Sequence, residues 1–125
     1  MFSHIMIGTN DLDRAKSFYD AVLGALGVAP GAVDRHRIFY RTRTGVFSVS
    51  LPINGVPATV ANGGTIGFAC NSAEQADAWH TAGLANGGTS CEDPPGVRDG
   101  SVGKLYLAYL RDPDGNKICA LQRMV

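Results

Sequence analysis

The chain has 125 residues, of which 45% are hydrophobic and 18% charged, a composition typical of one compact globular domain. Its 11 basic and 11 acidic residues give a formal net charge of zero, which argues against nucleic acid as a partner. No apolar run approaches the roughly 20 residues of a membrane-spanning helix, so we expect no membrane partner.

The N-terminal segment lacks the basic start and long apolar core of a secretory signal peptide. The cysteines, Cys70, Cys91 and Cys119, are odd in number and far apart, as in a protein whose thiols stay reduced. We therefore expect a cytoplasmic protein.

The first half of the chain predicts a strand, a helix and a hairpin. Residues 2–8 alternate and are rich in Ile and Met, which indicates a strand. Asn10 is the expected N-cap of a helix, because apolar residues recur at helical spacing from Leu12 to Leu26. Three further elements are expected before the midpoint: a short strand within 28–35, a hairpin of 36–42 and 45–51, and a linker rich in Gly, Pro and Asn at 52–64.

The second half repeats this plan. Residues 65–70 indicate a strand, and Asn71 is expected to cap a helix with Glu74 at the capping-box position. Gly87 and Gly88 end that helix. The remaining expected elements are a short strand at 89–92, a loop at 93–103, and a hairpin of 104–111 and 116–123 joined by the turn Asp112-Pro113-Asp114-Gly115.

An internal repeat underlies this similarity. A shift of 61 positions places the stretch 4–27 on the stretch 65–88. Identical residues then coincide at Ile5/Ile66, Asn10/Asn71, Ala15/Ala76, Ala21/Ala82, Leu23/Leu84 and Gly27/Gly88. A repeat of this length indicates two copies of one supersecondary unit related by a pseudo-two-fold axis, and it places a site where the copies meet.

We therefore expect an α+β fold of two tandem βαβββ modules. They would form a cupped eight-stranded mixed sheet with the helices on its outer face. The expected boundaries, within a single domain over 1–125, are module one at about 1–55, the linker at about 52–64 and module two at about 64–125.

Four segments resemble the vicinal oxygen chelate superfamily, which includes glyoxalase I, the bleomycin-resistance proteins and the extradiol dioxygenases. They are His4-Ile-Met-Ile7, Asp11-Leu-Asp-Arg-Ala-Lys-Ser-Phe-Tyr19, Gly64-Thr-Ile-Gly-Phe68 and Asp112-Pro-Asp-Gly-Asn-Lys-Ile118. The resemblance covers essentially the whole chain. It implies paired modules that enclose a cavity and, in metal-dependent members, four strand positions with His, Glu or Gln ligands for a divalent ion.

The resemblance places those four positions on His4, Ser50, Thr65 and Cys119. Only His4 keeps a residue of the expected kind. A Ser or Thr hydroxyl is a poor metal ligand, and one His plus one Cys is too few for a stable four-coordinate site. We therefore expect no metal cofactor. The alternative is a divalent Zn, Ni, Fe or Mn ion at a non-standard site on His4 and Cys119.

Two of these residues allow more than one role. His4 could act as a general base, or it could be a hydrogen-bonded residue of the cavity wall. Cys119 could be a nucleophile activated by His4, or simply a small buried side chain. Strand alternation puts both on the cavity face, because the more apolar set in each strand suits packing on the helices.

Further candidates for ligand contact are Tyr40, Tyr106 and Arg98, the last on a Gly- and Pro-rich loop where a guanidinium could clamp a carboxylate or phosphate. A second basic group could attract an anion or form a solvated hairpin edge; it consists of Arg35, Arg37, Arg41 and Arg43.

The favoured function is that of a bleomycin-resistance-like protein that binds a small organic molecule in the cavity as a homodimer. The alternative function is that of a metal-dependent lyase or dioxygenase, and a third is that of an accessory domain without a ligand. Fold alone does not decide among them.

Overall fold

The computed structural model describes residues 1–124; the last residue of the predicted second module, Val125, lies outside the described part. Module one consists of β1 (His4–Gly8), α1 (Leu12–Ala25), β2 (Ala32–Asp34), β3 (Arg37–Thr42) and β4 (Gly45–Ser50). Module two consists of β5 (Ile66–Ala69), α2 (Ala73–Ala85), β6 (Thr89–Ser90), β7 (Gly96–Gly100), β8 (Gly103–Arg111) and β9 (Lys117–Arg123).

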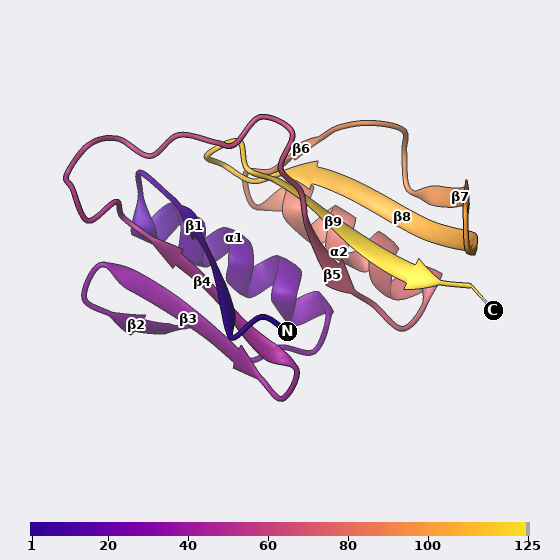
Figure 1. The fold of residues 1–125 in the computed structure, drawn as a ribbon, viewed down its shortest axis with the longest axis horizontal. Coiled ribbons are helices and arrows are strands. Elements are labelled where there is room, and N and C mark those ends of the chain that lie inside the picture. The colour runs from indigo at the N-terminus through magenta and orange to yellow at the C-terminus, as the bar shows by residue number, and fades with distance from the viewer. Residues whose placement is uncertain (125) are drawn as a thin grey trace.

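Each module forms one mixed sheet. The strand order is β1-β4-β3-β2 in the first sheet and β5-β9-β8-β6 in the second, where β7 also pairs with β8. The first strand of each module runs parallel to the last, and the other pairs are antiparallel. Both helices lie on the same side of the sheets and pack against each other (Figure 1). This confirms the predicted tandem βαβββ fold, although the described strands form two separate sheets rather than one of eight strands.

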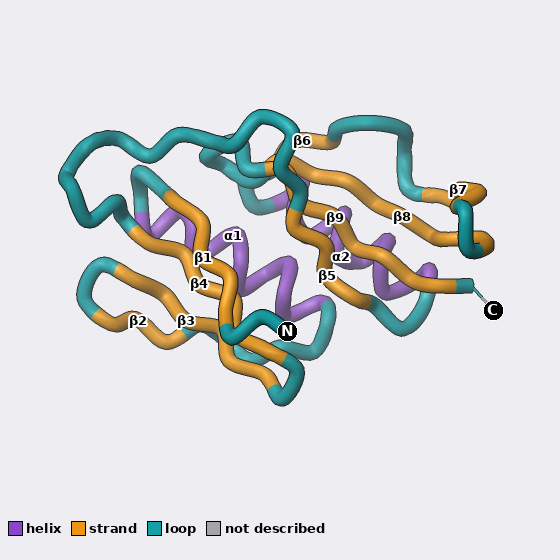
Figure 2. The backbone as a smooth tube through the Cα atoms, in the orientation of Figure 1, coloured by secondary structure: helices purple, strands orange, loops and turns teal. Residues whose placement is uncertain are grey.

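One segment differs from its prediction. The expected loop at 93–103 contains β7, which forms a tight hairpin with β8 (Figure 2). Gly103 has a φ of +119°, a conformation that an L side chain rarely adopts, and it lets the chain reverse next to Gly100. The expected loop is therefore in large part a hairpin, with Pro94 and Pro95 just before its first strand and Gly103 at its turn.

The helix caps lie one residue later than predicted. Asp11 and Ser72 cap the two helices, because their side chains accept the N–H groups of Arg14 and Gln75, respectively. The capping box of α2 uses Gln75 and not the predicted Glu74, since the Gln75 side chain accepts the N–H of Asn71.

Asn10 has a different role from the predicted one. Its side chain exchanges two hydrogen bonds with the backbone of Ala58 and so fastens the linker to the end of β1. A Cβ on Gly8 would lie 3.0 Å from the Ala58 Cβ, which shows how closely the linker packs on this strand.

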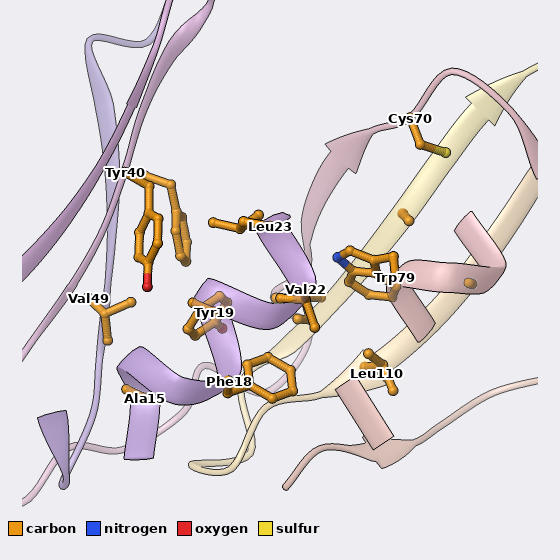
Figure 3. Packing of buried hydrophobic residues seen from close by; sticks show 14 of the residues in the cluster. Ala15, Phe18, Tyr19, Val22, Leu23, Tyr40, Val49, Cys70, Trp79 and Leu110 are labelled. Atoms are coloured by element: carbon orange, nitrogen blue, oxygen red, sulfur yellow. The ribbon is translucent and has the colours of Figure 1, made fainter. Parts of the chain in front are cut away.

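The hydrophobic core lies between the sheets and the helices (Figure 3). Phe18, Val22 and Trp79 are fully buried where the two helices meet, and Tyr19 packs against Phe47 at a ring-centroid distance of 4.9 Å. Burying each such side chain stabilises the fold by about 1.5–3 kcal/mol. The core thus joins both modules into one packed body.

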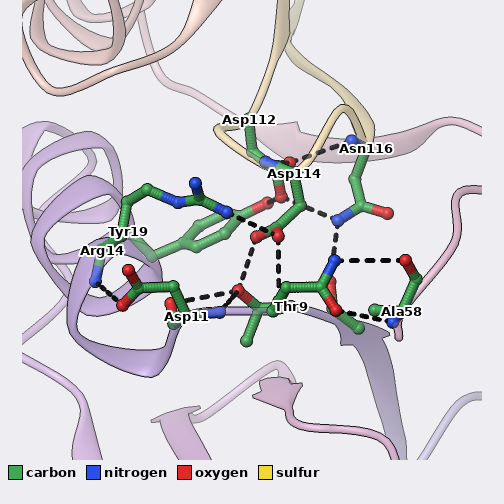
Figure 4. Close-up of polar contacts among 10 residues, drawn as sticks. Thr9, Asp11, Arg14, Tyr19, Ala58, Asp112, Asp114 and Asn116 are labelled. Atoms are coloured by element: carbon green, nitrogen blue, oxygen red, sulfur yellow. Dashed lines mark hydrogen bonds and ion pairs between the residues drawn. The ribbon is translucent and has the colours of Figure 1, made fainter. Parts of the chain in front are cut away.

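A buried polar cluster joins the modules at one end (Figure 4). Asp112, only 4% exposed, accepts the Tyr19 hydroxyl at 2.6 Å. Asp114 accepts the Thr9 hydroxyl at 2.5 Å and the Arg14 guanidinium at 2.8 Å. Because the two aspartates belong to the turn of module two and their partners to module one, this turn fixes the position of one module against the other.

Gly83 tests how tightly the helices pack. A Cβ at this buried position would overlap Leu110 and press on Val22 at 3.2 Å. Gly83→Ala is therefore expected to lower the free energy of unfolding by about 1 kcal/mol, although alanine favours helices, because overpacking costs about 1–3 kcal/mol. Chemical denaturation measures the change.

Gly24 provides the matched control, because it is exposed in α1 and nothing lies within 4 Å of an added Cβ. Gly24→Ala is expected to raise the free energy of unfolding by about 0.5–1 kcal/mol. Equal effects at the two glycines would contradict the close helix contact.

Candidate functional site

The sheet faces opposite the helices form what we call the open face. In module one it carries three rows of paired residues along β1, β4 and β3. The rows are His4–Val46–Arg41, Met6–Ser48–Phe39 and Gly8–Ser50–Arg37. The helix-side residues between them, such as Ile38 and Val49, are fully buried in the core. Alternation therefore directs the three rows away from the helices.

Module two carries corresponding rows on β5, β9 and β8. They are Gly67–Cys119–Tyr109 and Ala69–Leu121–Leu107, with Lys117–Arg111 beside Thr65 at the start of β5. The 61-residue repeat equates Met6 with Gly67, so the register makes Ser48 the counterpart of Cys119. It also makes the row of Gly8, Ser50 and Arg37 equivalent to the row of Ala69, Leu121 and Leu107, which is apolar.

His4 lies at the N-terminal end of β1 and is exposed. Its Nδ1 is 2.8 Å from the Ser3 hydroxyl, and its side chain lines a cavity of about 270 Å³ with Phe2 and residues 44–46. Ser50 lies at the opposite end of the same face, four residues along the parallel pairing. At about 3.3 Å per residue the two are about 13 Å apart, so they do not form one cluster.

Ser50 lines the larger of these cavities, one of about 510 Å³ between the strand ends and the linker. The Ser50 hydroxyl donates to the carbonyl of Leu51 at 2.7 Å. Arg37, its partner across the strands, lines the same cavity. The sequence placed Arg37 in a basic group without distinguishing it; its alternation with Phe39 and Arg41 was the signal that all three share one face.

Cys119 is buried beneath the surface of module two, where its Sγ would lie 3.3 Å from a Cβ on Gly67. Burial raises the pKa of this thiol to about 11, and the negative charge of Glu92 acts in the same direction. The Glu92 carboxylate is itself paired with Lys117. Cys119 is therefore a protonated thiol near neutral pH, which makes it a weak nucleophile.

Arg98 is held by its own hairpin. Its guanidinium donates to the carbonyl oxygens of Asp93 and Pro94 at 3.1 and 2.9 Å. Thr65 is exposed just before β5 and lines a small cavity of about 90 Å³. The structure thus distributes His4, Ser50, Thr65 and Cys119 along the open face and does not bring them into one cluster.

Tyr40 and Tyr106 lie on the helix side of their sheets and not on the open face. The Tyr40 hydroxyl donates to Asp20 of α1 at 2.8 Å, and the Tyr106 hydroxyl donates to Asp77 of α2 at 2.7 Å. Tyr40 is 2% exposed and forms part of the core. Both tyrosines therefore make sheet–helix contacts, while Tyr40 also lines a cavity of about 310 Å³; their contact with a ligand stays a prediction.

The family model of the Glyoxalase/Bleomycin resistance protein/Dioxygenase superfamily matches residues 1–120. The chain belongs to this superfamily. No curated protein matches the chain closely enough to count as a relative.

Solved structures of the superfamily share the fold. The chain is 66% identical to a glyoxalase/bleomycin resistance protein from Albidiferax ferrireducens T118, with 98% of each chain covered and a TM-score of 0.96. A glyoxalase-related enzyme from Fulvimarina pelagi is 21% identical, with 98% of this chain and 88% of that chain covered and a TM-score of 0.75. A lactoylglutathione lyase from Agrobacterium tumefaciens is 22% identical, with coverages of 98% and 92% and a TM-score of 0.65.

The side chains of this superfamily member do not fit the divalent ion that the metal-dependent members hold. Of the four positions that the resemblance indicates, only His4 carries an imidazole; Ser50 and Thr65 offer hydroxyls, as does Ser48, which the register equates with Cys119. The Cys119 thiol is protonated near neutral pH. Within residues 1–124, no group of three or more His, Cys, Asp or Glu side chains could hold a metal ion. In the same residues, no helix is long and apolar enough to cross a membrane.

The Asp20 carboxylate on α1 accepts the hydroxyl of Tyr40 and makes the stability of the fold depend on pH. Burial acts to raise the pKa of Asp20, but hydrogen bonds from the Gly31 N–H, Lys16 and Tyr40 outweigh it and lower this pKa. The ionised carboxylate therefore stabilises the fold above the unfolded pKa of about 3.9, and this contribution is lost as pH falls below that value.

We expect Asp20→Asn to cost about 1 kcal/mol of unfolding free energy at pH 7 and to reduce its loss between pH 4 and pH 2. Tyr40→Phe, which removes one of the carboxylate's bonds, is expected to reduce that loss only partly. Urea denaturation at a series of pH values measures both. An unaltered acid dependence in Asp20→Asn would contradict this role.

Proposed function

We propose that this superfamily member binds a small organic molecule on its open face and does so without a resident divalent metal ion. The observation that carries the proposal is the donor set at the four positions where metal-dependent members hold their ligands. His4, Ser50, Thr65 and Cys119 supply one imidazole, two hydroxyls and a protonated thiol. Such a set suits hydrogen bonding to the polar atoms of an organic molecule and not metal coordination.

The cavities on the open face support a ligand of ordinary size. The cavity beside Ser50 has a volume of about 510 Å³, within the range of about 300–1,000 Å³ that is usual for small-molecule sites. Most of its lining residues are apolar, and its polar ones are Arg37 and Ser50 at strand ends and Asn54 and Thr59 in the linker. The ligand we propose therefore has an apolar body and a limited number of polar atoms.

Metal analysis of protein purified without an affinity tag tests this function. We expect Ni, Zn, Fe and Mn to remain far below one ion per chain. Chelation is expected to leave the melting temperature unchanged, because no folding free energy comes from a metal.

His4→Ala is the matched variant for that measurement. Because His4 is exposed, we expect its melting temperature and its trace metal content to equal those of the wild type. One ion per chain in the wild type that is lost in His4→Ala would support a metal-dependent lyase or dioxygenase instead.

We also propose that the protein is a homodimer in which a second copy covers part of the open face. Met6 shares the face of His4 on β1, and Phe2 lines the same cavity as His4. Met6 is 40% exposed and Phe2 is 71% exposed. Apolar side chains gathered on one face favour association, and the zero net charge offers little repulsion.

Light scattering after size exclusion tests the dimer. We expect a mass of twice the 13.1-kDa chain, and we expect Met6→Glu to shift it toward one chain because a buried charge is costly. Val33→Glu is the control, since Val33 is 58% exposed on the edge strand β2. A wild-type mass of one chain would contradict the dimer.

A further inference from the structure

The cavity between the linker and the strand ends of module one has an unusual charge distribution. Its floor includes Arg37, Ser50 and Met6, and its other wall is linker segment 52–59. Arg37 is the one charged residue among the described residues that line it. The walls around this guanidinium are largely apolar, through Ile53, Val56 and neighbouring prolines.

Arg37 forms no ion pair among residues 1–124, and its buried Nε–H has no hydrogen-bond partner there. Asp34 faces it across the β2–β3 pairing, but the Asp34 carboxylate pairs with Arg35 at 3.4 Å instead. Other arginines are engaged: Arg14 with Asp114, and Arg111 with the carbonyl of Gly115. A guanidinium stays charged at every physiological pH, so a half-buried one without a counter-charge is unfavourable unless an anion compensates it.

Arg37 gives the cavity its positive charge and its hydrogen-bond donors at the strand ends. The Ser50 hydroxyl donates its proton to the Leu51 carbonyl, so it does not supply a donor to a ligand here. Low-dielectric walls strengthen the field of a single charge in a concave site. Arg37 is therefore the group in this cavity that would orient a negatively charged ligand.

The linker wall of the cavity is preformed, that is, held in place without a ligand. The two hydrogen bonds between Asn10 and the Ala58 backbone hold the linker wall in place, and Gly8 allows the linker to approach to van der Waals contact. A preformed wall reduces the entropy lost on binding. The same arrangement is absent from the described part of module two, where the equivalent row carries Leu107 and Leu121.

From this geometry we infer that the cavity binds a small organic anion, with its carboxylate, phosphonate or phosphate group on Arg37 and its apolar body against linker segment 52–59. The inference rests on the proposed function only in taking the open face as the surface that carries the ligand. It adds the chemical class of the ligand and the end of the face where it lies.

Titrations followed by two-dimensional NMR of the ¹⁵N-labelled full chain test the inference. The probes are benzoate and phenylphosphonate, with neutral benzamide as their uncharged counterpart. We expect saturable shifts of the amides of Met6, Gly8 and Ala58 with one or both anions, and none with benzamide. A preference between the two anions distinguishes carboxylate from phosphonate ligands.

Arg37→Met should weaken binding of the anion about 10- to 100-fold, the range for losing hydrogen bonds to a charged group. Arg37→Lys keeps the charge but not the planar fork and should give a smaller loss. Arg43→Met is the control, because it removes one positive charge from the exposed turn between β3 and β4. The amide spectra report whether each variant is folded.

Three results would overturn the inference: no saturable shifts at these amides with either anion, equal binding of benzamide, or equal weakening by Arg43→Met. Each is distinguishable from failure of the proposed function. Stoichiometric metal in the purified protein would refute the metal-free proposal, while anion binding that persists after chelation and depends on Arg37 would still support the inference.

Discussion

The arrangement of this molecule depends on the buried carboxylates of one turn. Asp112 and Asp114 lie in the reverse turn between β8 and β9, yet their partners Tyr19, Thr9 and Arg14 belong to the other module. Buried carboxylates are tolerated only when their hydrogen bonds are satisfied, and here backbone N–H groups of Asp114 and Asn116 complete the set around Asp112. No strand of one sheet pairs with a strand of the other among the described residues, so these hydrogen bonds of the turn help to determine how the two sheets are placed.

That junction extends directly to the candidate site. The Asn116 side chain donates to the carbonyl of Gly8, at the end of the strand on which the linker rests. The Asn10 contact with Ala58 follows two residues later. The linker wall beside Arg37 is thus held by hydrogen bonds that continue the network joining the two modules.

Much of the fold could be predicted from the sequence because it is encoded locally. The helical spacing of apolar residues and the Asp-Pro-Asp-Gly turn follow from near neighbours, and the repeat shows in the sequence itself as a match at a fixed offset; the structure confirms the elements that they predict. The positions of Tyr40 and Tyr106 were not accessible in this way, because their hydroxyls bond to Asp20 and Asp77 across the sheet–helix interface. The hairpin of β7 was missed since backbone pairing, and not side-chain pattern, creates it. The sequence offered no reason to separate Arg37 from the neighbouring arginines. The strand register does so, because it pairs Arg37 with Ser50 at the end of the strands that lines the cavity.

The unequal rows of the two modules set the stoichiometry expected of the proposed ligand. In module one the row carries the guanidinium of Arg37 beside the Ser50 hydroxyl, whereas the equivalent row of module two carries Leu107 and Leu121. Despite the internal repeat, the proposed function therefore implies one anion per chain and not a symmetric pair.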